Sequence, residues 1–387
     1  MYNFVLENPT KIIFGNNTIN QIGAETRHYG KNVLLVYGQG SIKKNGIYTS
    51  VNDSLRQNDL NITELGGIRA NPLLSDARKG IQLAKEQAID VIVAVGGGSV
   101  IDTAKAIAAG AVVDHNVWQF FRGKKGVTTP LPICTVLTLA ASGSEMNGGM
   151  VITNDETRQK LGVGNKKLCP KVSILDPTST FSVPATYTAY GAVDAIAHCL
   201  EYYFTTKLIN APVQDRFIEG LIINIIESCT ILMAEPDNYE ARANMMWCAT
   251  MALNGWTAAG LGQVGFPMHM IEHSLSAAYD LPHGAGLSVI IPAWLRWAES
   301  THTKKIAQFG ERVFDIGSGD MVTNANLAIE MLTSWFKGLG CPIKLSDCSI
   351  QANEIPALAE HSLIQAKIWR LKEYSKETII EILTIAG

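Results

Sequence analysis

The spacing of hydrophobic and polar positions changes along the chain near residue 182. Before that point, short apolar runs rich in β-branched residues alternate with segments of helical periodicity. Helical spacing covers 46–58 and 77–88. The runs expected to form buried strands are 32–38, 90–98, 130–142 and 171–177. This alternation of strands and helices predicts a parallel sheet with helices on both faces.

Beyond residue 182, strand-like runs become scarce and long helical patterns dominate. The expected helices lie at 190–204, 214–233, 243–254, 270–279, 306–314, 324–339 and 376–387. We therefore expect two domains: an α/β domain over residues 1–182 and an all-helical domain over residues 183–387.

Composition limits the possible partners of this chain. Its 387 residues are 47% hydrophobic and 17% charged, enough to bury a large core, and its net charge of -3 provides no broad cationic face for nucleic acid. Glu227 and Ser228 interrupt the longest apolar run, so we expect no membrane span. The first residues lack the pattern of a secretory signal. The seven cysteines form no CxxC pair, which indicates reduced thiols in a cytoplasmic protein.

A glycine turn follows one of the expected strands. In VIVAVGGGSVIDTAKAIA (91–108), Gly97 and Gly98 stand between strand and helix, followed by Ser99. Backbone N–H groups can approach a phosphate closely at such a turn, and the helix dipole favours an anion there. The spacing differs from GxGxxG because Ile101 occupies the third glycine position. A tight turn without any ligand is the alternative interpretation.

A second turn ends an earlier strand and has a different chemistry. Its residues are Gly38, Gln39, Gly40 and Ser41. NAD-binding turns often carry an acidic residue that binds the ribose hydroxyls, whereas this turn has none and precedes Lys43 and Lys44. The combination favours NADP(H) over NAD(H). Solvated lysines on a surface helix are the alternative.

Five side chains suggest a metal site. Asp194 and His198 are four residues apart in a helical pattern, as are His269 and His273, and residues at this spacing share one helix face. His283 follows a predicted break at Asp280-Leu281-Pro282. One carboxylate and three imidazoles would suit Zn(II) or Fe(II), leaving one histidine for proton transfer. Taken singly, each pair could equally be an ordinary helix contact.

A metallopeptidase is a competing interpretation of the same segment. Residues 269–273 match H-x-x-E-H, in which Glu272 would act as general base. That reading leaves Asp194, His198 and His283 without a role, and a peptidase has no use for the glycine turns.

Taken together, these motifs resemble the iron-activated (group III) alcohol dehydrogenases, in the branch of butanol dehydrogenases and broad-range aldehyde reductases. The resemblance extends over nearly the whole chain. It is carried by NPTKIIFG (8–15), GGGSVIDTAKAIA (96–108), LTLAASGSEMN (137–147), ILDP (174–177), YGAVDAIAH (190–198), ARANMMWCATMALNG (241–255) and MHMIEHSLSAAYDLPHGAGL (268–287). It implies a dehydroquinate synthase-like architecture, in which a Rossmann-like dinucleotide-binding α/β domain precedes an all-α domain.

The resemblance also implies roles for individual residues. It assigns the metal to Asp194, His198, His269 and His283, and leaves His273 as the catalytic histidine near the substrate. The implied cofactor-binding residues are Gly38, Gln39, Gly40, Ser41, Gly97, Gly98, Ser99, Asp102, Thr138, Ser142 and Lys160. Glycine is usual in the family where Gln39 stands here, and the segment 262–268 is less polar than in relatives.

The implied reaction is hydride transfer between NAD(P)H and a small aldehyde or primary alcohol, with one divalent metal, Fe(II) or Zn(II), polarising the carbonyl. The implied assembly is a homodimer. A lyase related to dehydroquinate synthase is an alternative, but residues 255–287 contain no Lys or Arg to bind a phosphorylated acid, which favours a small neutral aldehyde. A non-enzymatic binding protein is the remaining possibility.

Overall fold

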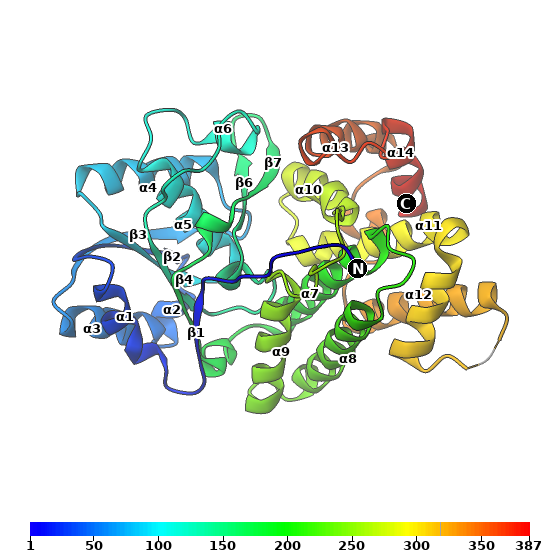
Figure 1. Cartoon of the computed structure of the whole chain (residues 1–387), viewed down its shortest axis with the longest axis horizontal. Helices are drawn as coiled ribbons and strands as arrows, with labels where there is room; N and C mark the ends of the chain where they lie inside the picture. Colours follow the sequence, from blue (N-terminus) through cyan, green and yellow to red (C-terminus); the bar gives the residue numbers. More distant parts are fainter. Residues whose placement is uncertain (318) are drawn as a thin grey trace. The chain divides into compact units, whose positions relative to one another are not determined.

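The computed structural model describes residues 1–317 and 319–387, which form two compact units. The sheet unit comprises Glu7–Val183 and Glu235–Asn254, and the helical unit comprises Met1–Leu6, Pro184–Ala234 and Gly255–Gly387 (Figure 1). The expected division at residue 182 differs from these units in two segments. Helix α9 (Tyr239–Ala252) belongs to the sheet unit because its Met246 is buried in the core beneath the sheet.

Six parallel strands form the sheet in the order β1-β8-β5-β4-β2-β3. They are β1 (Lys11–Phe14), β2 (Asn32–Gly38), β3 (Asn61–Ile68), β4 (Val91–Gly96), β5 (Ile133–Leu137) and β8 (Val172–Leu175). The four expected strands are present, although the strand expected over 130–142 is shorter. The two strands without a prediction, β1 and β3, are the edge strands, whose side chains are largely exposed or half-buried.

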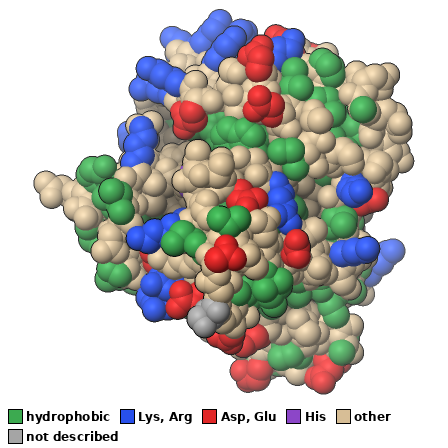
Figure 2. All heavy atoms as spheres, turned by 90° about the vertical axis from the view of Figure 1, so that its right-hand side faces the viewer, with side chains coloured by type: hydrophobic (Ala, Val, Ile, Leu, Met, Phe, Trp, Pro, Cys, Tyr) green, Lys and Arg blue, Asp and Glu red, His purple; other side chains and the backbone are tan. Residues whose placement is uncertain are grey.

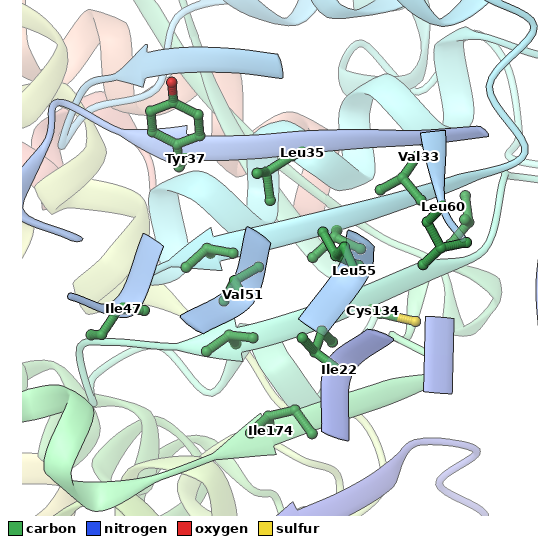
Figure 3. Packing of buried hydrophobic residues seen from close by; sticks show 14 of the residues in the cluster. Ile22, Val33, Leu35, Tyr37, Ile47, Val51, Leu55, Leu60, Cys134 and Ile174 are labelled. Atoms are coloured by element: carbon green, nitrogen blue, oxygen red, sulfur yellow. The ribbon is translucent and has the colours of Figure 1, made fainter. Parts of the chain in front are cut away.

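Helices cover both faces of the sheet. On one face, Ile22, Val51 and Leu55 pack against Val33 and Leu35 (Figure 3). On the other, alternate strand residues pack against the helices that follow β3 and β4. The first face carries α1 (Ile22–Arg27), α2 (Ser41–Lys44) and α3 (Ile47–Gln57), and the second carries α4 (Leu74–Glu86) and α5 (Gly98–Gly110). Burial on both faces explains why the central strands are almost continuously apolar.

The strand order places a topological switch point between β2 and β4. These two strands are neighbours, β3 lies beyond β2, and β5 and β8 lie beyond β4. The connections after β2 and β4 therefore run to opposite sides, and open α/β sheets bind their ligands at the carboxyl ends of the strands beside such a point. Because β2 ends at Gly38 and β4 at Gly96, both glycine turns lie beside this switch point.

The remaining elements of the sheet unit are short. It contains the antiparallel hairpin β6 (Gly149–Asn154) and β7 (Gln159–Gly164), helix α6 (Trp118–Phe121), and the 3-10 turns η1 (Ile19–Gln21), η2 (Ser144–Met146), η3 (Lys166–Leu168) and η4 (Pro177–Thr180).

A fully buried lysine fastens the hairpin segment to helix α5. The Lys105 ammonium donates to the Ser144 carbonyl at 2.8 Å, the Ser144 hydroxyl at 2.7 Å and the Gly149 carbonyl at 2.7 Å. One turn earlier, the Asp102 carboxylate accepts from the Ser144 hydroxyl at 2.6 Å and the Val151 N–H at 2.8 Å. Burial lowers the pKa of Lys105 to about 8, while Asp102 acts in the opposite direction. We call these hydrogen bonds of Lys105 and Asp102 the clamp; they fix the segment 144–151 against α5.

In the helical unit, the central helix is α7, which is buried over almost its whole length. It packs against α8 and α11, and α10 packs against α11 and α13. The helices are α7 (Ala185–Thr205), α8 (Pro212–Ala234), α10 (Pro267–Tyr279), α11 (His283–Phe314), α12 (Met321–Gly338), α13 (Ile355–Trp369) and α14 (Lys376–Ile385), with 3-10 turns η5 (Leu345–Cys348) and η6 (Ala352–Glu354).

One helix among the described residues, α8, has the length and apolar composition that a membrane crossing requires, with a mean hydropathy of 1.7. Helices inside a protein core meet the same criterion. Two buried acidic residues of α8 are paired with α11: Asp215 with Lys305 at 2.5 Å, and Glu219 with Arg312 at 3.1 Å. We therefore describe α8 as a helix that packs one face into this unit and leaves the other exposed.

Replacing Lys105 by Met should destabilise the sheet unit. The substitution leaves the Ser144 and Gly149 carbonyls without their donor and removes the cation beside Asp102, and each buried acceptor left unsatisfied costs about 1–3 kcal/mol. We expect calorimetry to show an unfolding temperature lower by about 10 °C. Lys79→Met removes an exposed lysine of α4 and should leave that temperature nearly unchanged. A shift for Lys105→Met as small as that of Lys79→Met would show that the clamp contributes little.

Candidate active site

Helix α7 brings three functional side chains to one face. Asp194, His198 and Glu201 are spaced by four and three residues, so they follow one another along that face. All three are buried because α7 is the central helix of its unit. The sequence predicted the first two of these residues and missed Glu201.

The other three predicted histidines lie on two further helices, α10 and α11, and the sequence explains where these helices begin and end. Pro267 occupies the first turn of α10, which carries His269, Glu272 and His273. The left-handed conformation of Asp280 ends α10, and Pro282 precedes the first residue of α11, His283. The predicted break at 280–282 is therefore present, and it lets a histidine of the next helix turn back toward α10.

The Asp194 carboxylate is the centre of the cluster. Its Oδ1 lies 3.7 Å from the Nε2 atom of His198, 3.6 Å from that of His269 and 3.7 Å from that of His283. The His198 and His269 rings are stacked, with centroids 4.5 Å apart. These four side chains come from three different helices.

The nitrogen–oxygen distances are too long for hydrogen bonds. Asp194 Oδ1 and His269 Nε2 are buried, yet neither has a hydrogen-bond partner among the residues that the structure describes. Ligand atoms around a tetrahedral Zn(II), each about 2.0–2.2 Å from the ion, lie about 3.4 Å from one another. The spacing and the unpaired buried atoms fit a divalent cation, and Asp194, His198 and His269 form a group that could hold one.

Two buried glutamates orient the imidazoles from behind. Glu201 Oε1 accepts from the His269 backbone N–H at 2.9 Å and lies 3.0 Å from His269 Nδ1. Glu272 pairs in the same way with His283 Nδ1 and also accepts from the Ser276 hydroxyl. Each glutamate thus fixes a ring with its Nε2 atom toward Asp194, as carboxylates do behind metal-binding histidines.

Glu272 also forms a second possible metal-binding group with His273 and His283. Both oxygens of its carboxylate are already engaged, one by His283 and the other by Ser276. A Cβ atom at position 286 would lie 2.5 Å from Glu272 Oε1, so only glycine fits beside this carboxylate. Glu272 is therefore a positioning group, which argues against the general base that the metallopeptidase interpretation requires.

The electrostatics keep Asp194 and His198 in the forms that bind a cation, whereas the carboxylates beside His269 favour its protonated form. Burial alone would raise the pKa of Asp194, but His198, His269 and His283 hold it below its usual range. Burial, together with His269 and His283, lowers the pKa of His198 to about 3, despite the opposing effect of Asp194. Burial would also lower the pKa of His269, but Asp194 and Glu201 raise it to about 9. Asp194 is thus ionised and His198 neutral near pH 7.

His273 lies beside this cluster. Its ring is buried, with its centroid 5.6 Å from that of His283 and 5.7 Å from that of Trp369. Asp194 lies 3.6–3.7 Å from the other three histidines, whereas His273 belongs only to the group with Glu272 and His283. The structure therefore separates the five predicted side chains into four that converge and one adjacent histidine.

In the sheet unit, the predicted cofactor residues lie at the ends of three adjacent strands. Gly38, Gln39, Gly40 and Ser41 end β2 and begin α2, Gly97, Gly98 and Ser99 join β4 to α5, and Thr138 follows β5. Gly40 has a φ of 129°, which favours glycine. A Cβ atom at Gly98 would lie 2.3 Å from the Ser142 hydroxyl, so this turn and Ser142 are in close contact.

Three other candidate residues have partners of their own. The Ser99 hydroxyl donates to the Ala70 carbonyl. The buried Lys160 ammonium of β7 donates to Asn71 Oδ1 at 3.1 Å. Asp102 has both oxygens engaged in the clamp with Ser144 and Val151, so its observed role is to fix α5.

Comparison with known proteins agrees with this arrangement. Residues 9–177 match the family model described as iron-containing alcohol dehydrogenase, and residues 188–387 match the C-terminal model of the Fe-containing alcohol dehydrogenase family. The chain is 42% identical to the probable NADH-dependent butanol dehydrogenase 1 of Bacillus subtilis (strain 168), over 99% of each chain. It is 39% identical to the NADPH-dependent aldehyde reductase YqhD of Escherichia coli (strain K12), over 94% of this chain and 95% of that one.

A solved structure shows the same fold. The NADH-dependent butanol dehydrogenase A of Thermotoga maritima has a TM-score of 0.96 and 41% identity, and the match covers 100% of this chain and 99% of that chain. The matched family and the names of these relatives identify the chain as an oxidoreductase of the alcohol dehydrogenase class. The chain belongs to the iron-containing alcohol dehydrogenase family.

Replacing Glu201 by Gln should weaken divalent-cation binding without emptying the site. The glutamine retains an acceptor oxygen for His269 but loses the negative charge behind the ring, and changes of this kind cost about 10- to 100-fold in metal affinity. Competition with a chelator measures the effect, and Glu227→Gln on the exposed side of α8 is the matched control. If the affinities of both variants equal that of the unmodified protein, Glu201 has no part in ordering the ligands.

Proposed function

We propose that this oxidoreductase reduces small neutral aldehydes with a reduced nicotinamide and, in reverse, oxidises the corresponding primary alcohols. The observation that carries the proposal is the convergence of three imidazoles on the buried carboxylate of Asp194. The names of the relatives, butanol dehydrogenase and aldehyde reductase, support the same substrate class.

In this proposal, Asp194, His198, His269 and His283 hold one divalent cation. Its chemistry is that of a Lewis acid, which polarises a carbonyl oxygen and stabilises the negative charge that develops there during reduction. One carboxylate with three imidazoles suits Fe(II) or Zn(II), with His269 releasing its proton as the cation binds, and the family description favours iron. Glu201 and Glu272 keep the imidazoles aligned throughout the reaction.

The sheet unit binds the dinucleotide at the switch point. The backbone N–H groups of Gly97, Gly98 and Ser99 lie at the N-terminus of α5, where the helix dipole favours a pyrophosphate. Thr138 and Ser142 are assigned to the nicotinamide side, and Lys160 to the ribose side. The clamp formed by Lys105 keeps the pyrophosphate turn and the segment 144–151 in a fixed relation.

NADP(H) is favoured over NAD(H) because of the turn that follows β2. Gln39 provides no negative charge there, and the Lys43 ammonium lies 4.8 Å and 4.7 Å from the ring centroids of Tyr37 and Tyr48. Glu64 accepts from both tyrosine hydroxyls, at 2.8 Å and 2.6 Å. The two rings therefore hold a cation close to the turn, where it can pair with a 2′-phosphate.

His273 completes the chemistry as the proton donor. It lies beside His283 and takes no part in the group around Asp194, so its imidazole can exchange a proton with the substrate oxygen as the carbonyl is reduced. In the oxidation of an alcohol, the same imidazole would accept that proton.

The distribution of charged residues favours a neutral substrate. Residues 255–287 contain no Lys or Arg, which favours a neutral aldehyde over the phosphorylated acid of a lyase. On the face drawn in Figure 2, acidic and basic side chains are interspersed, which gives a polyanion no continuous basic area there.

Seven free cysteines, six of them buried, support a reducing, cytoplasmic environment. A homodimer is the proposed assembly.

Assaying the purified protein with NADPH and NADH against a panel of aldehydes, with elemental analysis, tests the function. Asp194→Ala should lose both metal and activity. His273→Ala should keep near-normal metal content while its turnover falls about 10²- to 10⁴-fold, the usual contribution of a general acid. His28→Ala, which removes an exposed histidine, is the control. An Asp194→Ala variant that keeps metal and activity would refute the ligand assignment, and metal loss in His273→Ala would make His273 a ligand.

Replacing Gln39 by Asp should shift cofactor preference from NADP(H) toward NAD(H). A carboxylate at this turn would repel the 2′-phosphate and accept hydrogen bonds from free ribose hydroxyls. We expect the KM for NADPH to rise about tenfold, the equivalent of about 1.4 kcal/mol of repulsion, while that for NADH falls. Lys43→Met should raise the KM for NADPH alone, with Lys31→Met as control. A wild-type enzyme that already prefers NADH would contradict the proposed preference.

A further inference from the structure

Two aromatic side chains lie against the imidazole cluster and have no part in the chemistry above. The Phe266 ring centroid is 5.5 Å from that of His269, and the Trp369 centroid is 5.7 Å from that of His273. Phe266 and Trp369 also contact each other edge to face, at 6.3 Å. We call these two rings the aromatic pair. All four residues belong to the helical unit.

Both members of the aromatic pair are held in place by the backbone around them. Phe266 immediately precedes the first turn of α10, and the buried Tyr202 of α7 packs edge-on against it at 5.3 Å. Trp369 is the last residue of α13, where the chain turns back and the Leu371 N–H bonds to the Ala366 carbonyl at 2.9 Å. The rings are therefore fixed features of the site.

The segments that carry the two rings also touch. A Cβ atom at Gly265 would lie 3.0 Å from Leu371 Cδ2, so the residue before Phe266 packs closely on the chain just after Trp369. The segments that carry the phenylalanine and the tryptophan, just over a hundred residues apart in the sequence, therefore pack against each other.

The exposure of the pair differs from that of its neighbours. His269, His273 and Tyr202 are buried, whereas Phe266 and Trp369 are both half-buried. Each ring therefore contacts an imidazole on one side and keeps part of its surface accessible. Because residues 255–287 contain no Lys or Arg, the accessible surface next to Phe266 has no basic group from its own segment.

We propose that Phe266 and Trp369 form the contact surface for the carbon chain of the substrate, and that they select unbranched alkyl or aryl aldehydes over hydroxylated ones. This inference rests on the proposed function and specifies its substrate class. Aromatic faces gain free energy with each methylene group that they shield from water. They provide no hydrogen bond for a hydroxyl group, which would lose its hydration there.

A chain-length series separates substrate contact from mere positioning of His273. For the holoenzyme, we expect kcat/KM to rise about fourfold with each methylene from propanal to hexanal, matching the free energy of burying one CH₂ group. In Trp369→Leu and Phe266→Leu the rise should fall below about twofold per methylene, since less apolar surface remains to be covered. Activity with glycolaldehyde should change least.

Trp297→Leu is the matched control. Trp297 is also a half-buried tryptophan of the helical unit, but its ring contacts are with Trp294 and Tyr374. Its chain-length profile should equal that of the unmodified enzyme. Trp369→Phe, which keeps an aromatic face, should restore most of the slope. A loss of the same factor for every aldehyde in Trp369→Leu would show that the tryptophan only positions His273, and would overturn the inference.

Binding of unreactive aliphatic amides distinguishes the failure of this inference from failure of the proposed function. Titration calorimetry with propanamide through hexanamide should show affinity rising with chain length, and Trp369→Leu should flatten that rise. An enzyme that reduces no aldehyde would overturn the proposed function, whatever the amides do. Amide affinities independent of chain length in the unmodified protein would overturn the contact surface, even if aldehydes are reduced.

Discussion

The helical unit is organised around the burial of one ionised carboxylate. Asp194 is removed from water on the central helix, where an isolated charge is costly, and its surroundings consist of imidazole nitrogens from α7, α10 and α11. Glu201 and Glu272 add two further buried acidic groups behind those rings. The divalent cation that we propose for this site would balance this concentration of negative charge, so the packing of three helices and the proposed chemistry depend on the same interaction.

The sheet unit contributes in a different manner, mainly through its backbone. Glycine turns follow the adjacent strands β2 and β4, on either side of the switch point at which open α/β sheets bind their ligands. Side chains act here mostly as supports: Lys105 and Asp102 fix α5, and Ser142 packs on Gly98. Recognition by backbone groups tolerates many sequences, so the departure from GxGxxG at Ile101 is compatible with the proposed binding of a pyrophosphate at this turn.

The sequence predicted the parts of this structure that have a local periodic pattern. The central strands were visible because both of their faces are buried, and Asp194 and His198 because four residues bring side chains to one helix face. Edge strands β1 and β3 were missed since their half-exposed side chains break the apolar pattern. Glu201 was missed, and Glu272 was considered only as a general base, because the positioning role of a helical glutamate cannot be seen until its partner on another helix is known. The partners of Asp102 likewise come from residues more than forty positions away.

The assignment of α9 to the sheet unit has a consequence for how such chains can be divided. The polypeptide passes from one unit to the other after Leu6, Val183, Ala234 and Asn254, so neither unit is a continuous stretch of sequence. Cutting at residue 182 would remove Met246 from the core below the sheet and Thr250 from its 2.5 Å bond to the buried Glu145. Gene fusion or shuffling at that boundary would therefore transfer a stretch of sequence that lacks part of its folded unit. The two halves of the gene are thus constrained to be inherited together.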